Sequence, residues 1–212
     1  MKEGAQYLSW SDQNVTEQLC VYLERDQVVV GSSDTVLGLL ANVTETAFIE
    51  LNQLKARSEK PYIILISDID KLSHFIDQQL SPDVLNLLNF CWPGPLTMIF
   101  QAKNSLASFM TSSDCKIALR VPQHDELRNL LVHFKGLFST SANLTGQPVP
   151  NLIENVDGQI LAAVAGIVLG QDRGSTLPST ILDCSSGRIK VIRAGAYSID
   201  SLQRLCQDQF EK

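Results

Sequence analysis

Hydroxyl, amide and cationic side chains gather where the predicted strands and helices of this 212-residue chain begin or end. The residues that share this property are Thr35, Lys55, Arg57, Lys60, Ser139–Asn143, Ser179 and Arg193. Guanidinium groups grip phosphate or carboxylate at two points, while hydroxyls and amides orient a ligand. These residue types predict a site for an anionic ligand, such as a nucleotide, together with a small polar partner.

Two more cations bracket one predicted strand. Lys116 and Arg120 are four residues apart, which is an even number of pleats, so we expect both side chains on the same face of that strand. Arg120 lies between Leu119 and Val121. A charge that alternates into a buried face normally needs a partner, so Arg120 is the cation least easily explained as surface.

Purely structural roles stay open for the other groups. Lys55 and Arg57 could complement the C-terminus of a helix, and Ser139–Asn143 could form a turn and a helix cap. The Pro-Gly-Pro stretch after Trp92 is typical of a helix stop before a strand. Thr97 could face either the site or the core, and the pattern does not decide between them.

Several common chemistries lack their motifs. The chain has no G-x-x-x-x-G-K-[ST] loop, no G-x-G-x-x-G turn after a strand and no G-x-S-x-G elbow. Its three histidines have no metal-ligand spacing, and its five cysteines include no C-x-x-C pair. We therefore predict no resident metal, no disulfide framework and no side-chain nucleophile.

The net charge of −6 means that RNA binding would require a local basic groove.

The elements that must position these side chains alternate between strand and helix. Apolar runs predict strands at 28–30, 36–41, 62–66, 96–100, 117–121, 137–138, 167–169, 180–183 and 190–192. Helical spacing and caps predict helices at about 12–23, 44–54, 81–91, 125–134, 154–164 and 198–210. This alternation indicates an α/β fold, and a hairpin across 180–192 indicates a mixed sheet. We expect one domain, 1–212. No run of about 18 apolar residues occurs, so we expect it not to lie in a membrane. The five scattered cysteines and the polar N-terminal stretch favour the cytoplasm.

Seven polar or Gly/Pro-containing blocks follow one another between about residues 12 and 200. They are Ser33–Leu39, Lys55–Arg57 with Lys60-Pro61, Trp92–Thr97, Ala118–Pro122, Ser139–Gly146, Ser179–Asp183 and Arg193–Gly195. In this order, the set resembles the YrdC-domain family, the threonylcarbamoyl-AMP synthases. The resemblance implies a single-domain twisted mixed sheet with flanking helices and a large concave groove.

The resemblance also implies a reaction. L-Threonine, bicarbonate or CO2, and ATP would give L-threonylcarbamoyl-AMP and pyrophosphate, with Mg²⁺ carried on ATP. The product would feed threonylcarbamoylation of the adenosine beside the anticodon of tRNA, through downstream threonylcarbamoyl-transferase proteins and with a possible tRNA contact. By position, the implied threonine contacts are Thr35, Arg120 and Ser179. The implied ATP contacts are Arg57, Lys60, Lys116, Ser141, Asn143, Asn151 and Arg193, and the implied catalytic cations are Lys55 and Arg57.

The chain departs from the family pattern in a few places. Ser32-Ser33 stand where the family usually has Pro-Thr, and Leu37 stands where it usually has Tyr. The Arg57–Pro61 stretch is one residue shorter than the family spacing. Larger members carry a further C-terminal domain, which this chain is too short to include, so we expect the product to pass to separate proteins. The alternative reading is a non-catalytic RNA-binding paralogue of the same fold.

Overall fold

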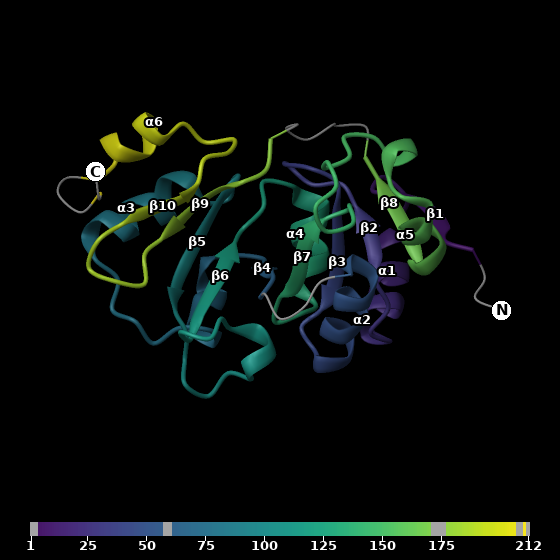
Figure 1. Cartoon of the computed structure of the whole chain (residues 1–212), viewed down its shortest axis with the longest axis horizontal. Coiled ribbons are helices and arrows are strands. Elements are labelled where there is room, and N and C mark those ends of the chain that lie inside the picture. Colours follow the sequence, from purple (N-terminus) through teal and green to yellow (C-terminus); the bar gives the residue numbers. More distant parts are fainter. Residues whose placement is uncertain (1–3, 57–60, 171–176, 207–209, 211–212) are drawn as a thin grey trace.

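A computed structural model describes residues 4–56, 61–170, 177–206 and 210. These residues form one ten-stranded mixed sheet, in the order β1-β8-β2-β3-β7-β4-β6-β5-β9-β10 (Figure 1). The strands are β1 Gln6–Ser9, β2 Val29–Gly31, β3 Gly38–Asn42, β4 Ile63–Leu65, β5 Leu96–Gln101, β6 Lys116–Arg120, β7 Leu137–Ser141, β8 Gly166–Leu169, β9 Thr180–Asp183 and β10 Lys190–Arg193.

Six α-helices and three short 3-10 helices flank this sheet within the described residues. The α-helices are α1 Val15–Glu24, α2 Glu45–Lys55, α3 Pro82–Cys91, α4 Asp125–Val132, α5 Gly158–Ala163 and α6 Ile199–Arg204. The 3-10 helices are η1 Ile69–His74, η2 Ser108–Met110 and η3 Ile153–Asn155. Figure 1 shows α3 and α6 beside β9 and β10 at one end of the molecule, and α1, α2 and α5 beside β1, β2 and β8 at the other.

The predicted α/β class and mixed sheet are confirmed. β9 and β10 pair antiparallel, as expected for the hairpin, whereas β5 pairs parallel with β9 and antiparallel with β6. Central strands of the sheet alternate their side chains between two buried faces, whereas the edge strand β10 is exposed. In β2, Val29 packs with α1 and α4, while Val30 packs into the larger cluster on the opposite face with Leu39 and Phe138.

Two helix starts follow from local hydroxyl caps, as the sequence predicts. The side-chain oxygen of Thr44 accepts a hydrogen bond from the amide of Ala47 at 3.1 Å, and that of Ser81 accepts one from Val84 at 3.4 Å. The predicted cap of the first helix is wrong. α1 begins at Val15, and the Asp12 carboxylate instead accepts from the amide of Ser9 at 2.7 Å.

Other boundaries differ because contacts distant in sequence set them. β1 was not predicted; it is a short edge strand that pairs only with β8, starting at Gln6 opposite Gly166. The predicted helix 154–164 is divided into η3 and α5, because Asp157 caps a new helix by accepting from the amide of Gln159. β7 extends through Ser141, so the hydroxyl run that was expected to follow this strand belongs partly to it. The predicted helix 198–210 is shorter, since α6 ends at Arg204.

Candidate active site

Arg120, at the end of β6, is the centre of a buried polar cluster. Its side chain is 6% exposed, and its Nε donates to the carbonyl oxygen of Gly94 at 3.1 Å. Its Nη1 donates to the Thr35 hydroxyl at 3.0 Å, and its Nη2 forms an ion pair with Asp34. The sequence expectation that Arg120 faces inward and has partners is therefore met by a loop 85 residues away.

Burial lowers the pKa of the Arg120 guanidinium, since a charge loses hydration inside the protein. The negative charge of Asp34 counteracts this shift, and the positive charge of Arg193 adds to it. Arg193 therefore lies close enough to Arg120 for the two cations to affect each other. This concentration of positive charge suits an anionic ligand.

Ser179 joins Arg193 to the same region. The Ser179 hydroxyl lies 2.8 Å from that of Thr97, which is fully buried. Arg193 donates to the Ser179 carbonyl at 3.1 Å from Nε and 2.8 Å from Nη2, and to the Ser179 hydroxyl at 3.2 Å. Thr97, which the sequence leaves undecided, thus points toward the polar cluster. The parallel pairing of β5 with β9, with Thr97 opposite Ile181, causes this.

Two glycines allow the backbone of this cluster to approach closely. A Cβ at Gly195 would lie 2.3 Å from the Pro178 carbonyl oxygen and 2.6 Å from that of Ser179. A Cβ at Gly94 would lie 2.4 Å from the Cys91 carbonyl oxygen and 3.0 Å from the Tyr197 hydroxyl. Any larger residue at either position would push apart the segments that carry Ser179 and the acceptor of Arg120.

A second polar cluster lies at the C-terminus of α2. Lys55 is 3% exposed, and its ammonium donates to the carbonyl oxygen of Ser141 at 2.7 Å, to that of Asn143, and to the Asn143 side-chain oxygen at 3.0 Å. The hydroxyl of Ser141 also donates to the Asn143 side chain. The amide and hydroxyl of Thr145 both bond the Lys55 carbonyl. Lys55 therefore fixes the segment that carries two predicted nucleotide contacts.

The loop 32–37 connects the two clusters. Thr35 bonds Arg120, and the carbonyl of Leu37 accepts from the amide of Ala142 at 2.9 Å. Ser32, which stands where a proline was expected by resemblance, accepts from the Trp10 indole and the Gly170 amide, both at 3.1 Å. The serine hydroxyl therefore supports this loop by hydrogen bonds that a proline would not make.

Four predicted site residues remain, and the two that the structure describes, Lys116 and Asn151, have no described hydrogen bond or ion pair to these clusters. Lys116 shares the predicted face of β6 but pairs with Asp183 at 3.0 Å and Asp114 at 3.1 Å. Arg57 and Lys60 lie outside the described residues. Asn151 is exposed, and it lines a cavity of about 410 Å³ together with Asn143.

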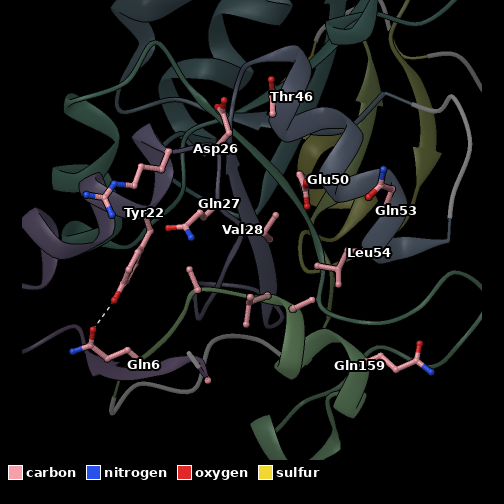
Figure 2. Close-up of a pocket in the computed structure, with 15 residues that line it drawn as sticks. Gln6, Tyr22, Asp26, Gln27, Val28, Thr46, Glu50, Gln53, Leu54 and Gln159 are labelled. Atoms are coloured by element: carbon pink, nitrogen blue, oxygen red, sulfur yellow. Dashed lines mark hydrogen bonds between the residues drawn. The ribbon is translucent and has the colours of Figure 1, made fainter. Parts of the chain in front are cut away.

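A larger cavity of about 1010 Å³ lies elsewhere, between α1, α2, α5 and the start of β1 (Figure 2). Its polar lining includes Gln6, Gln27, Glu50 and Gln159, and the Tyr22 hydroxyl donates to Gln6 within it. None of the predicted site residues that the structure describes lines this cavity. We place the candidate active site at the two polar clusters because their cations match the predicted chemistry.

A sequence model of the Sua5/YciO/YrdC family, described as "Telomere recombination", matches residues 21–195. This range holds the charged side chains of both clusters, from Asp34 to Arg193. The chain belongs to the Sua5/YciO/YrdC family. The resemblance stated from its seven sequence blocks is therefore confirmed.

Curated relatives of this Sua5/YciO/YrdC chain share about one third of its residues. A Vibrio campbellii protein named threonylcarbamoyl-AMP synthase is 32% identical over 177 residues, which cover 82% of this chain and 96% of the relative. A Bacillus subtilis protein of the same name is 32% identical over 202 residues, which cover 92% of this chain and 57% of the relative. The chain thus spans nearly all of one relative and little more than half of the other.

Solved structures of the family share the fold. P. abyssi Sua5 complexed with L-threonine matches with a TM-score of 0.84 at 21% identity, covering 98% of this chain and 62% of that protein. E. coli YciO matches with a TM-score of 0.80 at 18% identity, covering 95% of this chain and all of that protein. At these identities the likeness establishes the fold alone.

Sequence reasoning assigned no role to some residues that the structure places in the site. Asp34 forms an ion pair with Arg120, and the Gly94 carbonyl accepts a hydrogen bond from Arg120. The Tyr197 hydroxyl packs closely against the backbone of Gly94. An acidic residue directly before Thr35 was a usable signal for Asp34, because a buried arginine calls for a counter-ion. The backbone carbonyl of Gly94 leaves no such signal in the sequence.

In the described part of the chain, no helix is long and apolar enough to cross a membrane. Likewise, no three His, Cys, Asp or Glu side chains within the described ranges lie close enough together to hold a metal ion.

Proposed function

We propose that this chain is a threonylcarbamoyl-AMP synthase, which joins L-threonine, bicarbonate or CO2, and ATP into L-threonylcarbamoyl-AMP with release of pyrophosphate. The observation that carries the proposal is the buried Arg120, held by Thr35 and influenced by the charge of Arg193. Curated relatives at 32% identity carry the same function in their names. A solved relative of the same fold is described as a complex with L-threonine.

The chemistry needs cations more than it needs a nucleophile. The threonine amine captures CO2 to give a carbamate, and an oxygen of this carbamate attacks the α-phosphorus of ATP while pyrophosphate leaves. The carbamate and the triphosphate that react with each other are both anions, so the protein must neutralise charge and hold the carbamate in line with the leaving group. Buried and partly buried arginines supply this, since they stay protonated and bind oxyanions at two points.

We assign the amino-acid end of the substrate to the Arg120 cluster. Arg120 and the hydroxyls of Thr35 and Ser179 would bind threonine, because a guanidinium and two hydroxyls match its carboxylate and its own hydroxyl. Arg193 is exposed on one side while it bonds Ser179, so it could also reach a phosphate. It would lie between the two substrates.

We assign the nucleotide to the Lys55 side of the site. Ser141, Asn143 and Asn151 offer hydroxyl and amide groups that can orient a nucleoside, and Lys55 holds two of them in place. Arg57, Lys60 and Lys116 remain proposed contacts of the triphosphate. Mg²⁺ would arrive on the triphosphate, whose hard oxygens it prefers.

The experiment is an assay of pyrophosphate release from ATP by the full chain. We expect release only when both L-threonine and bicarbonate are present. Arg193→Ala and Arg57→Ala should each slow turnover at least tenfold, as is common when a charged transition-state contact is lost. Pyrophosphate release that is independent of threonine, from folded protein, would refute the proposal.

The proposed product would be passed to downstream transferase proteins and end on tRNA, and we propose the cytoplasm as the place of the reaction because ATP and tRNA meet there. The competing reading, a non-catalytic RNA-binding paralogue, predicts tRNA binding without ATP consumption. Such binding should weaken steeply as salt is raised.

A further inference from the structure

One acidic side chain in the Arg120 cluster is only half used. The Asp34 carboxylate is 9% exposed, and its Oδ1 accepts from Arg120. Its other oxygen, Oδ2, is buried and has no hydrogen-bond partner among the described residues. A buried carboxylate oxygen without a donor is costly, and each such group in a folded protein calls for an explanation.

The surroundings of Asp34 show what is absent. Each nitrogen of the Arg120 guanidinium already bonds one partner, Gly94, Thr35 or Oδ1 of Asp34, and these bonds use three of its five N–H groups. The second nearby arginine, Arg193, donates to Ser179 and not to Asp34. The vacant acceptor of Asp34 therefore lies beside a fixed positive group.

An α-amino acid carries both charges that such a place requires. Its carboxylate complements a guanidinium, and its ammonium complements a carboxylate, and both groups are attached to the same Cα atom. The Asp34–Arg120 pair presents the opposite polarity side by side. A zwitterion bound against this pair would satisfy Oδ2 without adding net charge to a buried site.

We propose that Asp34 is a substrate-binding residue whose Oδ2 accepts a hydrogen bond from the α-ammonium group of the amino-acid substrate. This inference rests on the proposed function for the identity of that substrate as L-threonine. It makes the pair of Asp34 and Arg120 a selectivity device that admits zwitterionic amino acids and disfavours acids that lack the amine. The alternative is that Asp34 acts only as the counter-ion of Arg120.

The test measures binding by calorimetry, without ATP, on the full chain. The probes are L-threonine, the 2,3-dihydroxybutyrate of matching stereochemistry, in which a hydroxyl replaces the amine, and L-threoninamide, which lacks the carboxylate. Asp34→Asn keeps the size of the side chain and an oxygen that can accept from Arg120. The matched control is Asp125→Asn, on the surface of α4, where the carboxylate is 86% exposed and pairs only with Arg128 among the described residues.

We expect the wild-type chain to bind L-threonine at least tenfold more tightly than the dihydroxy acid, in keeping with a hydrogen bond between charged groups. Asp34→Asn should weaken L-threonine binding about tenfold and leave the dihydroxy acid within threefold, so the discrimination disappears. Wild type and Asp34→Asn should show the same ratio of L-threonine affinity to L-threoninamide affinity. In the pyrophosphate assay, the variant should raise the KM for threonine and leave the KM for ATP unchanged. Asp125→Asn should match the wild type throughout.

Equal losses for L-threonine and the dihydroxy acid in Asp34→Asn would overturn the inference, since a counter-ion role acts on both ligands alike. An unaltered affinity for L-threonine would overturn it as well. If Asp34→Asn does not fold, the wild-type chain still decides, because equal binding of the two ligands, or no threonine binding, refutes the assignment. If pyrophosphate release depends on threonine and Asp34→Asn has the same KM for threonine as wild type, this inference is refuted and the proposed function stands. If the wild-type chain binds threonine selectively but releases no pyrophosphate, the proposed reaction is refuted and the role of Asp34 stands.

Discussion

Lys55→Met tests whether the buried ammonium at the end of α2 holds the nucleotide side of the site together. The substitution keeps an unbranched side chain of similar length and removes the charge. It takes away the donor that serves the Ser141 carbonyl at 2.7 Å, the Asn143 carbonyl and the Asn143 side-chain oxygen at 3.0 Å. The segment 141–143 would then lose its main anchor to α2.

The magnitude follows from these contacts. A hydrogen bond to a charged donor contributes about 1.5–3 kcal/mol, but three bonds from one ammonium do not add independently. Removing the buried charge also removes its desolvation penalty, and water can reach the half-buried Ser141 and Asn143. We therefore expect a loss of about 3 kcal/mol, which for a chain of this size lowers the Tm by about 6–12 °C.

The assay combines thermal unfolding with the pyrophosphate assay. We expect the lower Tm together with a KM for ATP raised at least tenfold, because Ser141 and Asn143 are no longer held. The matched control is Lys103→Met, at a lysine that bonds the Ser73 carbonyl and pairs with an exposed aspartate. It should change stability by no more than about 1 kcal/mol. A wild-type Tm and an unchanged KM for ATP in Lys55→Met would refute the anchoring role.

Two further predictions concern other parts of the site. Burial alone would raise the pKa of Asp183, but hydrogen bonds from Ser185 and Lys116 outweigh burial and lower the pKa. The ionised carboxylate therefore stabilises the fold at pH values above its ordinary pKa. This contribution is lost as the pH falls through the lowered pKa. Chemical denaturation of Asp183→Asn should show a deficit against wild type at pH 7 that shrinks below about pH 4; a deficit constant down to pH 3 would contradict this. Gly195→Ala should lower the free energy of unfolding by about 1–3 kcal/mol and raise the KM for threonine, because its Cβ would lie 2.6 Å from the Ser179 carbonyl. The control Gly187→Ala, which has open space around it, should change neither quantity. Equal melting curves for the two variants would contradict the crowding at Gly195.

The features of the fold that could be predicted from the sequence are those that neighbouring residues determine. A hydroxyl at Thr44 or Ser81 meets an amide three residues later, so the cap is a local event and its position is correct. β1 has no such local cause. Its four residues form a strand only because the β8 edge, which begins at Gly166, is available to pair with it. The same holds for the break in the helix predicted at 154–164, where Asp157 competes as a cap.

The candidate site divides along the same line. The alternation of β6 correctly predicts that Arg120 faces the interior, and the end of α2 is correctly placed at Lys55. The interpretation of Lys55 as a cation that complements its own helix terminus misses its main partners, which lie 86 and 88 residues further along the chain. The need of a buried charge for a partner can be predicted locally, whereas the identity of that partner cannot.

Strand order determines those partners. β9 is the neighbour of β5 and β6 in the sheet although it lies far from them in the chain, and this places Arg120, Thr97 and Ser179 at one end of three adjacent strands. Thr97 and Ser179 are 82 residues apart and lie within hydrogen-bonding distance only because β5 and β9 run parallel in this register. A shift of one residue in that pairing would turn Thr97 to the opposite face of the sheet. The site therefore depends on the register of the sheet as much as on the residue types that the sequence displays.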